Sequence, residues 1–152
     1  MIQLVDEFFE AKNDPDQISV TEEVISRLGK IHPATLSEKK DENGPIAWIL
    51  VLPTIQGLME EFVAEQINER ELLKKTPIGS SYDSVYLCSA LVLPEHRGNG
   101  LARGLAVDAV RSIQRDHPIR HLFCWPFSTE GEKLANSIAR ELDLPLRQRS
   151  SQ

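Results

Sequence analysis

Cysteine is scarce in this sequence, and its placement excludes several classes of protein. The two cysteines, Cys88 and Cys124, both lie inside apolar runs. Thiols in such surroundings are usually buried and reduced, as in cytoplasmic proteins, whereas disulfides are typical of secreted chains. Neither cysteine has the spacing of a zinc ligand, and the four histidines form no close pair with them. We therefore expect neither a metal site nor a disulfide framework.

Long apolar runs and an excess of positive charge are also missing. No apolar run approaches the roughly 18 residues of a membrane-spanning helix, and the acidic N-terminal stretch lacks the basic start of a signal peptide. The net charge of −6 argues against a surface that binds nucleic acid regardless of base sequence, and it suits a cationic amine substrate. We expect a cytoplasmic protein that binds no membrane and no nucleic acid.

Length and composition are those of an ordinary globular protein. The chain has 152 residues, of which 41% are hydrophobic and 26% are charged. This length allows one domain with a buried core. Because no repeat or low-complexity segment divides the sequence, we expect a single domain over residues 1–152.

The first half of the chain carries both helical and strand-like patterns. Apolar residues at helical spacing predict an amphipathic helix over 1–12, although residues 1–5 could instead form a short first strand. A capping box begins a second helix, which Gly29 would end, and an Asn-Gly turn at Gly44 joins two antiparallel strands. The remaining expected ranges are a helix at about 20–28, strands at roughly 33–40 and 45–52, and one helix at about 55–74.

The middle of the chain holds a strand, a glycine-rich turn and a helix in direct succession. The apolar run over 85–93 lacks alternation, which predicts a strand buried on both faces. A turn containing Gly98 and Gly100 leads into a helix that begins at Leu101 and ends at His117, before a proline. The first amides of a helix lack partners and carry the positive end of its dipole. The turn therefore predicts a pyrophosphate cradle.

The last third of the sequence predicts one further strand and one further helix. Residues 119–127 form another apolar run, and a capping box at 129–132 precedes a helical stripe that ends at about 142. A short final strand is expected at 144–147. Arg147, Arg149 and the residues from Ser150 onward have the composition of a frayed tail.

The string from Val92 to Ala102 resembles motif A of the GNAT family, the Gcn5-related N-acetyltransferases. The family signature, Arg/Gln-x-x-Gly-x-Gly/Ala between a central strand and a helix, is met by Arg97, Gly100 and Ala102. The resemblance covers roughly residues 84–117 best. It implies an α/β, GNAT-like fold with a central mixed β-sheet flanked by helices. The helix at 55–74 departs from the family, which usually joins those strands by a short turn; it either caps the acceptor site or covers a sheet face.

The resemblance also implies acetyl-CoA as the co-substrate and assigns its binding residues. Backbone groups at the end of the central strand would pair with the pantetheine arm, one amide would polarise the thioester carbonyl, and the turn with its arginines would hold the pyrophosphate. The cofactor-binding residues expected on this basis are Ala90, Leu91, Val92, Arg97, Gly98, Asn99, Gly100, Leu101, Ala102 and Arg103.

Direct attack of an amine on the acetyl group needs a base for the amine and an acid for the departing thiolate. The glutamate that some family members use as base falls at Ser84, so Asp83 is the nearest carboxylate, unless it is simply a solvated loop residue. The family's usual tyrosine acid falls near Ala139 and is absent. Tyr86 or Tyr82 could replace it, or could serve only in packing.

Cys88 lies near the expected thioester and is a candidate acyl nucleophile. No histidine or aspartate partner for it is readable from the sequence, and the alternative is a small buried hydrophobic residue. The catalytic candidates are therefore Asp83, Tyr86 and Cys88.

We expect an N-acetyltransferase that moves an acetyl group from acetyl-CoA to a primary amine by direct attack. The acceptor is a small molecule, a peptide N-terminus or a lysine. The alternative is a non-catalytic module that binds coenzyme A or an acyl-CoA. Another nucleotide binder is less well supported, because no Gly-Lys-Ser/Thr follows the turn and Arg103 occupies the third glycine position of a dinucleotide fingerprint. A homodimer is compatible with the resemblance, since many relatives dimerise.

Overall fold

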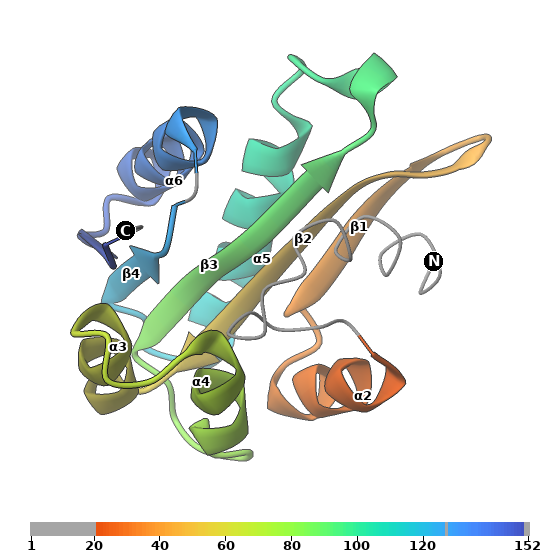
Figure 1. The fold of residues 1–152 in the computed structure, drawn as a ribbon. Helices are drawn as coiled ribbons and strands as arrows, with labels where there is room; N and C mark the ends of the chain where they lie inside the picture. Colours follow the sequence, from red (N-terminus) through yellow and green to blue (C-terminus); the bar gives the residue numbers. More distant parts are fainter. Residues whose placement is uncertain (1–20, 127, 151–152) are drawn as a thin grey trace.

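The computed structural model describes residues 21–126 and 128–150 of the chain, and the helix or strand expected at 1–12 lies outside these residues. The described part is an α/β structure with a five-stranded mixed sheet flanked by helices (Figure 1). Its elements are α2 (Glu22–Ile31), β1 (Leu36–Asp41), β2 (Gly44–Thr54), α3 (Gln56–Val63), α4 (Glu69–Lys75), β3 (Ser84–Val92), the 3₁₀ turn η1 (Pro94–His96), α5 (Leu101–Asp116), β4 (His121–Cys124), α6 (Thr129–Leu142) and β5 (Leu146–Gln148).

The strands follow one another across the sheet in chain order, β1-β2-β3-β4-β5. β2 runs antiparallel to both β1 and β3, whereas β3, β4 and β5 run parallel to one another. The parallel steps are possible because α5 and α6 provide the crossovers between strands. The expected central mixed sheet is confirmed, and the 85–93 run is its middle strand, β3.

Helices cover the two faces of the sheet. α5 runs along one face behind β2 and β3, and α2 and α4 lie toward the viewer on the other side (Figure 1). α5 begins at Leu101 and ends at Asp116, as its apolar stripe predicts, and the buried residues of that stripe include Ala106, Ala109 and Ile113. Small alanines let the helix backbone approach the sheet closely.

The single helix expected at 55–74 is wrong, because the structure has two short helices there. α3 ends at Val63, and Glu65 takes a left-handed conformation with φ of 65°. Asn68 then caps a new helix: its side chain accepts a hydrogen bond from the amide of Glu71, whose carboxylate accepts one from the amide of Asn68. This capping box satisfies the first amides of α4 and fixes the break.

Several boundaries also differ from the sequence-based ranges. α2 continues through Gly29 to Ile31, so Gly29 is not the terminating residue; the burial of Leu28 and Ile31 against the core carries the helix one turn further. β4 covers only four residues, His121–Cys124, of the predicted 119–127. The expected turn does join β1 to β2. Gly44 has a positive φ of 119° there, and the amide of Asn43 donates a hydrogen bond to the side chain of Asp41.

Arg147 and Arg149, near the end of the described chain, are more firmly packed against the rest of the protein than the sequence suggests. Arg147 belongs to β5. The guanidinium of Arg149 lies 4.6 Å from the ring centre of Phe62 and 4.5 Å from that of Trp125, and it donates to the carbonyl of Ile67 at 2.6 Å. The frayed tail expected from Arg147 and Arg149 is therefore wrong for these two residues. Over the described ranges, no helix is long and apolar enough to cross a membrane.

Candidate functional site

The sheet opens between its third and fourth strands. β3 pairs with β4 only from Ser84 to Leu87, although β3 itself continues to Val92. β4 ends at Cys124, and α6 begins five residues later at Thr129. The far half of β3 therefore presents one edge to a gap inside the sheet. The sequence could not show this opening, because it arises from the short length of β4.

A β-bulge marks the point where the opening begins. Leu87 pairs with Val51 and Ser89 pairs with Leu50, so Cys88 is the extra residue of the bulge in this register. Bulges bend a strand and redirect the side chain at the bulge, and they are common beside active sites. The bulge, the end of the β3–β4 pairing and the start of the opening all meet at Cys88.

The backbone beyond the bulge faces the gap at alternate residues. The amide of Leu93 donates to the carbonyl of Ile46 on β2. Since backbone groups alternate sides along a strand, those of Val92 and Ala90 point away from β2. The carbonyl of Val92 accepts a hydrogen bond from Nε of Arg97 at 3.1 Å, which agrees with this direction. An extended ligand in the gap could pair with this edge as a further strand would.

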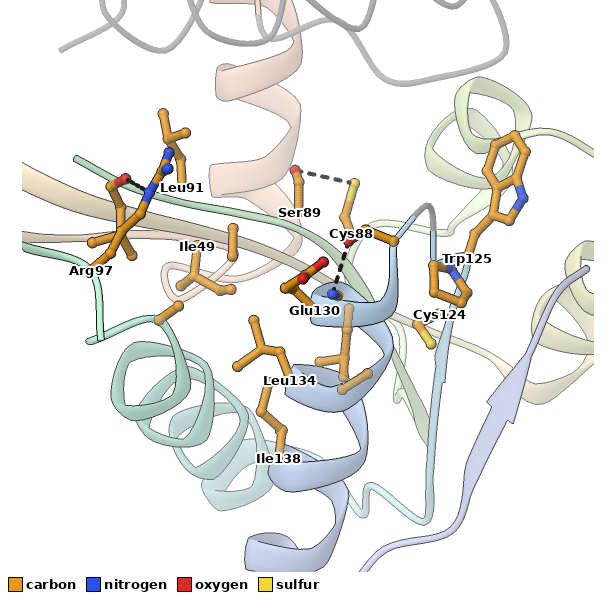
Figure 2. Close-up of a pocket in the computed structure, with 18 residues that line it drawn as sticks. Ile49, Cys88, Ser89, Leu91, Arg97, Cys124, Trp125, Glu130, Leu134 and Ile138 are labelled. Atoms are coloured by element: carbon orange, nitrogen blue, oxygen red, sulfur yellow. Dashed lines mark hydrogen bonds between the residues drawn. The ribbon is translucent and has the colours of Figure 1, made fainter. Parts of the chain in front are cut away.

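The opening is a cleft of about 530 Å³, closed on the other side by α6. Figure 2 shows Leu134 and Ile138 projecting from α6 toward Ile49, with Cys88 and Ser89 of β3 above them. Most lining side chains are apolar. The lining residues are Ile49, Leu87, Cys88, Ser89, Ala90, Leu91, Val92, Arg97, Ala102, Cys124, Trp125, Pro126, Ser128, Glu130, Gly131, Leu134, Ala135 and Ile138.

The glycine turn lies beside one end of this cleft, at the start of α5. Gly98 and Gly100 have φ of 85° and 72°, a region that other residues rarely adopt, which explains both glycines. Gly100 is the N-cap, and the amide of Gly104 donates to its carbonyl at 3.0 Å. The amides of the first turn, from Leu101 to Arg103, therefore have no acceptor within the helix. This end of the cleft is suited to an anion.

Nine of the ten expected cofactor-binding residues lie in the cleft or in the turn beside it. Ala90, Leu91, Val92, Arg97 and Ala102 line the cleft. Gly98, Asn99, Gly100 and Leu101 form the adjoining turn.

Arg103 points elsewhere, because its guanidinium donates to Ser137 at 2.7 Å and to Glu141 at 2.5 Å. It joins α5 to α6, so of the two expected arginines only Arg97 lines the cleft.

The carboxylate of Asp83 is far from the opening. Asp83 lies five positions before Cys88 along an extended strand, a distance of about 16 Å. Its carbonyl accepts hydrogen bonds from the amides of Arg120 and His121, and its carboxylate accepts one from Ser84. Asp83 thus helps to hold the parallel strands together at the opposite end of β3, and this placement does not support its expected role as base.

Cys88 and Tyr86 meet a carboxylate that sequence reasoning missed. Glu69 of α4 is only 3% exposed, and its Oε2 accepts a hydrogen bond from the Tyr86 hydroxyl and lies 3.7 Å from Sγ of Cys88. Burial, followed by the negative charge of Glu69, raises the pKa of Tyr86 well above its usual value, so its phenol stays protonated and donates. One signal was available: Glu69 precedes Leu72 and Leu73 by three and four residues, which places it on the apolar face of a helix.

The second thiol of the cleft, Cys124, is expected to be chemically inert. Burial, with a smaller contribution from the charge of Glu132, raises the pKa of Cys124 from 9.0 to about 12. At pH 8 its thiolate fraction should be roughly 1000-fold lower than in the unfolded chain, and its alkylation slower to a similar degree. Peptide mass spectrometry after iodoacetamide treatment, with and without guanidinium, measures this ratio. Similar rates in both conditions would show that Cys124 is not buried as described.

Within residues 21–126 and 128–150, no cluster of three or more histidine, cysteine or acidic side chains could hold a metal ion. In comparisons with known proteins, no family model and no curated protein matches this sequence.

Proposed function

We propose that this chain has a GNAT-like fold and is an N-acetyltransferase, which moves an acetyl group from acetyl-CoA to a primary amine in the cytoplasm. One observation carries the proposal: the opening beside β3 leads to the two-glycine turn at the start of α5. An apolar cleft with an exposed strand edge suits an extended amide-containing arm, and the adjoining helix N-terminus suits its phosphates.

The parts of acetyl-CoA can be assigned to this arrangement. The pyrophosphate would lie on the amides of the turn, with Arg97 supplying a positive charge. The pantetheine arm would run along β3 and pair with the backbone of Ala90 and Val92. The acetyl group would then lie near Cys88, where the strand bulges and a backbone amide can polarise the thioester carbonyl.

The acceptor is a primary amine of a small molecule, a peptide N-terminus or a lysine. It must lose a proton before it attacks, and the resemblance implies that it attacks the thioester directly. Among the cleft-lining residues of the described chain, Glu130 is the one carboxylate, and it is exposed on the first turn of α6. Glu130 is therefore better placed than Asp83 to accept the proton in a direct attack.

A second candidate is a non-catalytic protein that binds coenzyme A or an acyl-CoA in the same cleft. It is favoured by Ala139, a buried residue near the position where the family commonly has its tyrosine acid. Positioning alone can supply much of the rate of such transfers, so turnover decides between the two candidates.

Isothermal titration calorimetry with acetyl-CoA, coenzyme A and ATP tests the shared part of both functions. We expect the two coenzymes to bind and ATP to bind at least tenfold more weakly, because ATP lacks the arm that fills the apolar cleft. Turnover with a panel of primary amines then separates the enzyme from the binding protein. Failure of acetyl-CoA to bind would reject both.

A further inference from the structure

The cleft, the β-bulge and a buried carboxylate meet at Cys88. Cys88 is one of the residues that line the cleft, and its position in β3 is the bulge itself. If acetyl-CoA binds as proposed above, the thioester carbon lies beside this thiol. The inference that follows rests on that proposed function.

Behind the thiol, seen from the cleft, lies a carboxylate whose geometry is fixed by a second donor. Oε2 of Glu69 is 3.7 Å from Sγ of Cys88, and the same oxygen accepts the hydrogen bond of Tyr86. Glu69 is only 3% exposed, and it does not line the cleft. The order from the cleft inward is therefore thiol, carboxylate, phenol. A nucleophile backed by a base, with a third group orienting the base, is the arrangement used in covalent catalysis.

We propose that Cys88 is a covalent acyl carrier, which takes the acetyl group from acetyl-CoA as a thioester and then passes it to the amine, with Glu69 as its proton acceptor.

The two displacements balance in atoms and charge. In the first, Sγ forms a bond to the acetyl carbon, the bond from that carbon to the coenzyme A sulfur breaks, and the thiol proton passes to Glu69. Coenzyme A leaves as its thiolate and takes a proton from the water of the open cleft. In the second, a neutral amine forms the C–N bond, the bond to Sγ breaks, Sγ takes back the proton that Glu69 holds, and the amine proton passes to water. Both steps exchange acyl groups, so no oxidant, reductant or metal is consumed.

The charge of Glu69 explains why the proton should leave during the attack and not before it. A thiolate 3.7 Å from a carboxylate would place two negative charges side by side in a buried site, which is electrostatically unfavourable. In the structure the thiol is the donor of its hydrogen bond to this carboxylate. Tyr86, which stays protonated, holds the accepting oxygen in place by its hydrogen bond, and is a positioning residue because it touches no reacting atom.

Cys124 supplies a matched control within the same cleft. It also lines the cleft, but its raised pKa of about 12 and the absence of any described hydrogen bond to a carboxylate distinguish it from Cys88. Covalent chemistry should therefore occur at one of the two thiols only.

The test is mass spectrometry of the full chain after incubation with acetyl-CoA in the absence of amine. We expect one added acetyl group, mapped to Cys88, which disappears when an amine is added. It should be lost in Cys88→Ala, and in the wild type no acetyl group should map to Cys124. In Glu69→Gln the rate of acetylation should fall at least 100-fold while calorimetry shows acetyl-CoA binding within threefold of wild type.

Rapid-quench kinetics of the wild type provide a test that does not depend on the folding of any variant. Acetyl-Cys88 must form and decay at least as fast as the amide product accumulates. Product formation without this intermediate, or at an unchanged rate in Cys88→Ala, would overturn the acyl carrier and leave direct attack, with the proposed function intact. Failure of acetyl-CoA to bind would overturn both.

Discussion

Replacing Ala102 by glutamate is expected to abolish measurable binding of acetyl-CoA. Ala102 lines the cleft in the first turn of α5, beside the proposed pyrophosphate site. A carboxylate there, about 4 Å from a phosphate, would cost up to ~4 kcal/mol at the effective dielectric of a protein surface. This corresponds to a loss of affinity of about 100- to 1000-fold, which isothermal titration calorimetry can measure.

The fold should survive this change, because an acidic residue in the first turn of a helix is favoured by the dipole and Ala102 has an ordinary helical conformation. Ala102→Gln adds similar bulk without charge and should weaken binding by less than tenfold. Gly29→Glu adds the same charge at an exposed position of α2, with open space around it, and should leave binding unchanged. Equal binding in the wild type and Ala102→Glu would contradict a phosphate site at this turn.

Replacing Phe62 by alanine is expected to destabilise the protein more than any surface change. Phe62 of α3 is fully buried, and its ring lies 4.8 Å from that of Tyr86 and 5.8 Å from that of Phe123. The guanidinium of Arg149 also rests on this ring. Removing a buried phenylalanine side chain leaves a cavity and costs about 3–5 kcal/mol of unfolding free energy. Urea denaturation followed by circular dichroism gives the difference.

Glu60→Ala on the exposed side of the same helix is the control, and it should change the unfolding free energy by no more than about 0.5 kcal/mol. A loss below about 1 kcal/mol in Phe62→Ala would mean that α3 does not pack on the sheet as described, since such a small cost is typical of partly exposed side chains.

The sequence predicted the second half of the fold well because that half is held by strong periodic patterns. The unbroken apolar run of β3 and the apolar stripe of α5 each extend over most of their element, so few other structures suit them. The segment at 55–74 failed for the opposite reason. Apolar residues at helical spacing continue across the break, and only the hydrogen bonds of Asn68 and Glu71 reveal that a new helix starts.

Site residues were predictable only where they belong to one continuous stretch. The turn and the end of β3 follow one another in the sequence, and together they border the cleft. Glu69 reaches Cys88 from 19 positions earlier, through a helix packed on the sheet, and nothing in the local pattern of β3 points to it. Asp83 shows the converse. It is close to the motif in the sequence, but the extended strand between them places it far from the cleft.

The opening between β3 and β4 also bears on how this protein avoids aggregation. A strand edge with unpaired backbone groups can template pairing with another chain, and proteins usually protect such edges with charges, bulges or a covering element. Here the edge from Cys88 to Val92 is recessed behind α6 and bent by a bulge. The bulge and the covering helix therefore shield this strand edge from pairing with another copy of the chain.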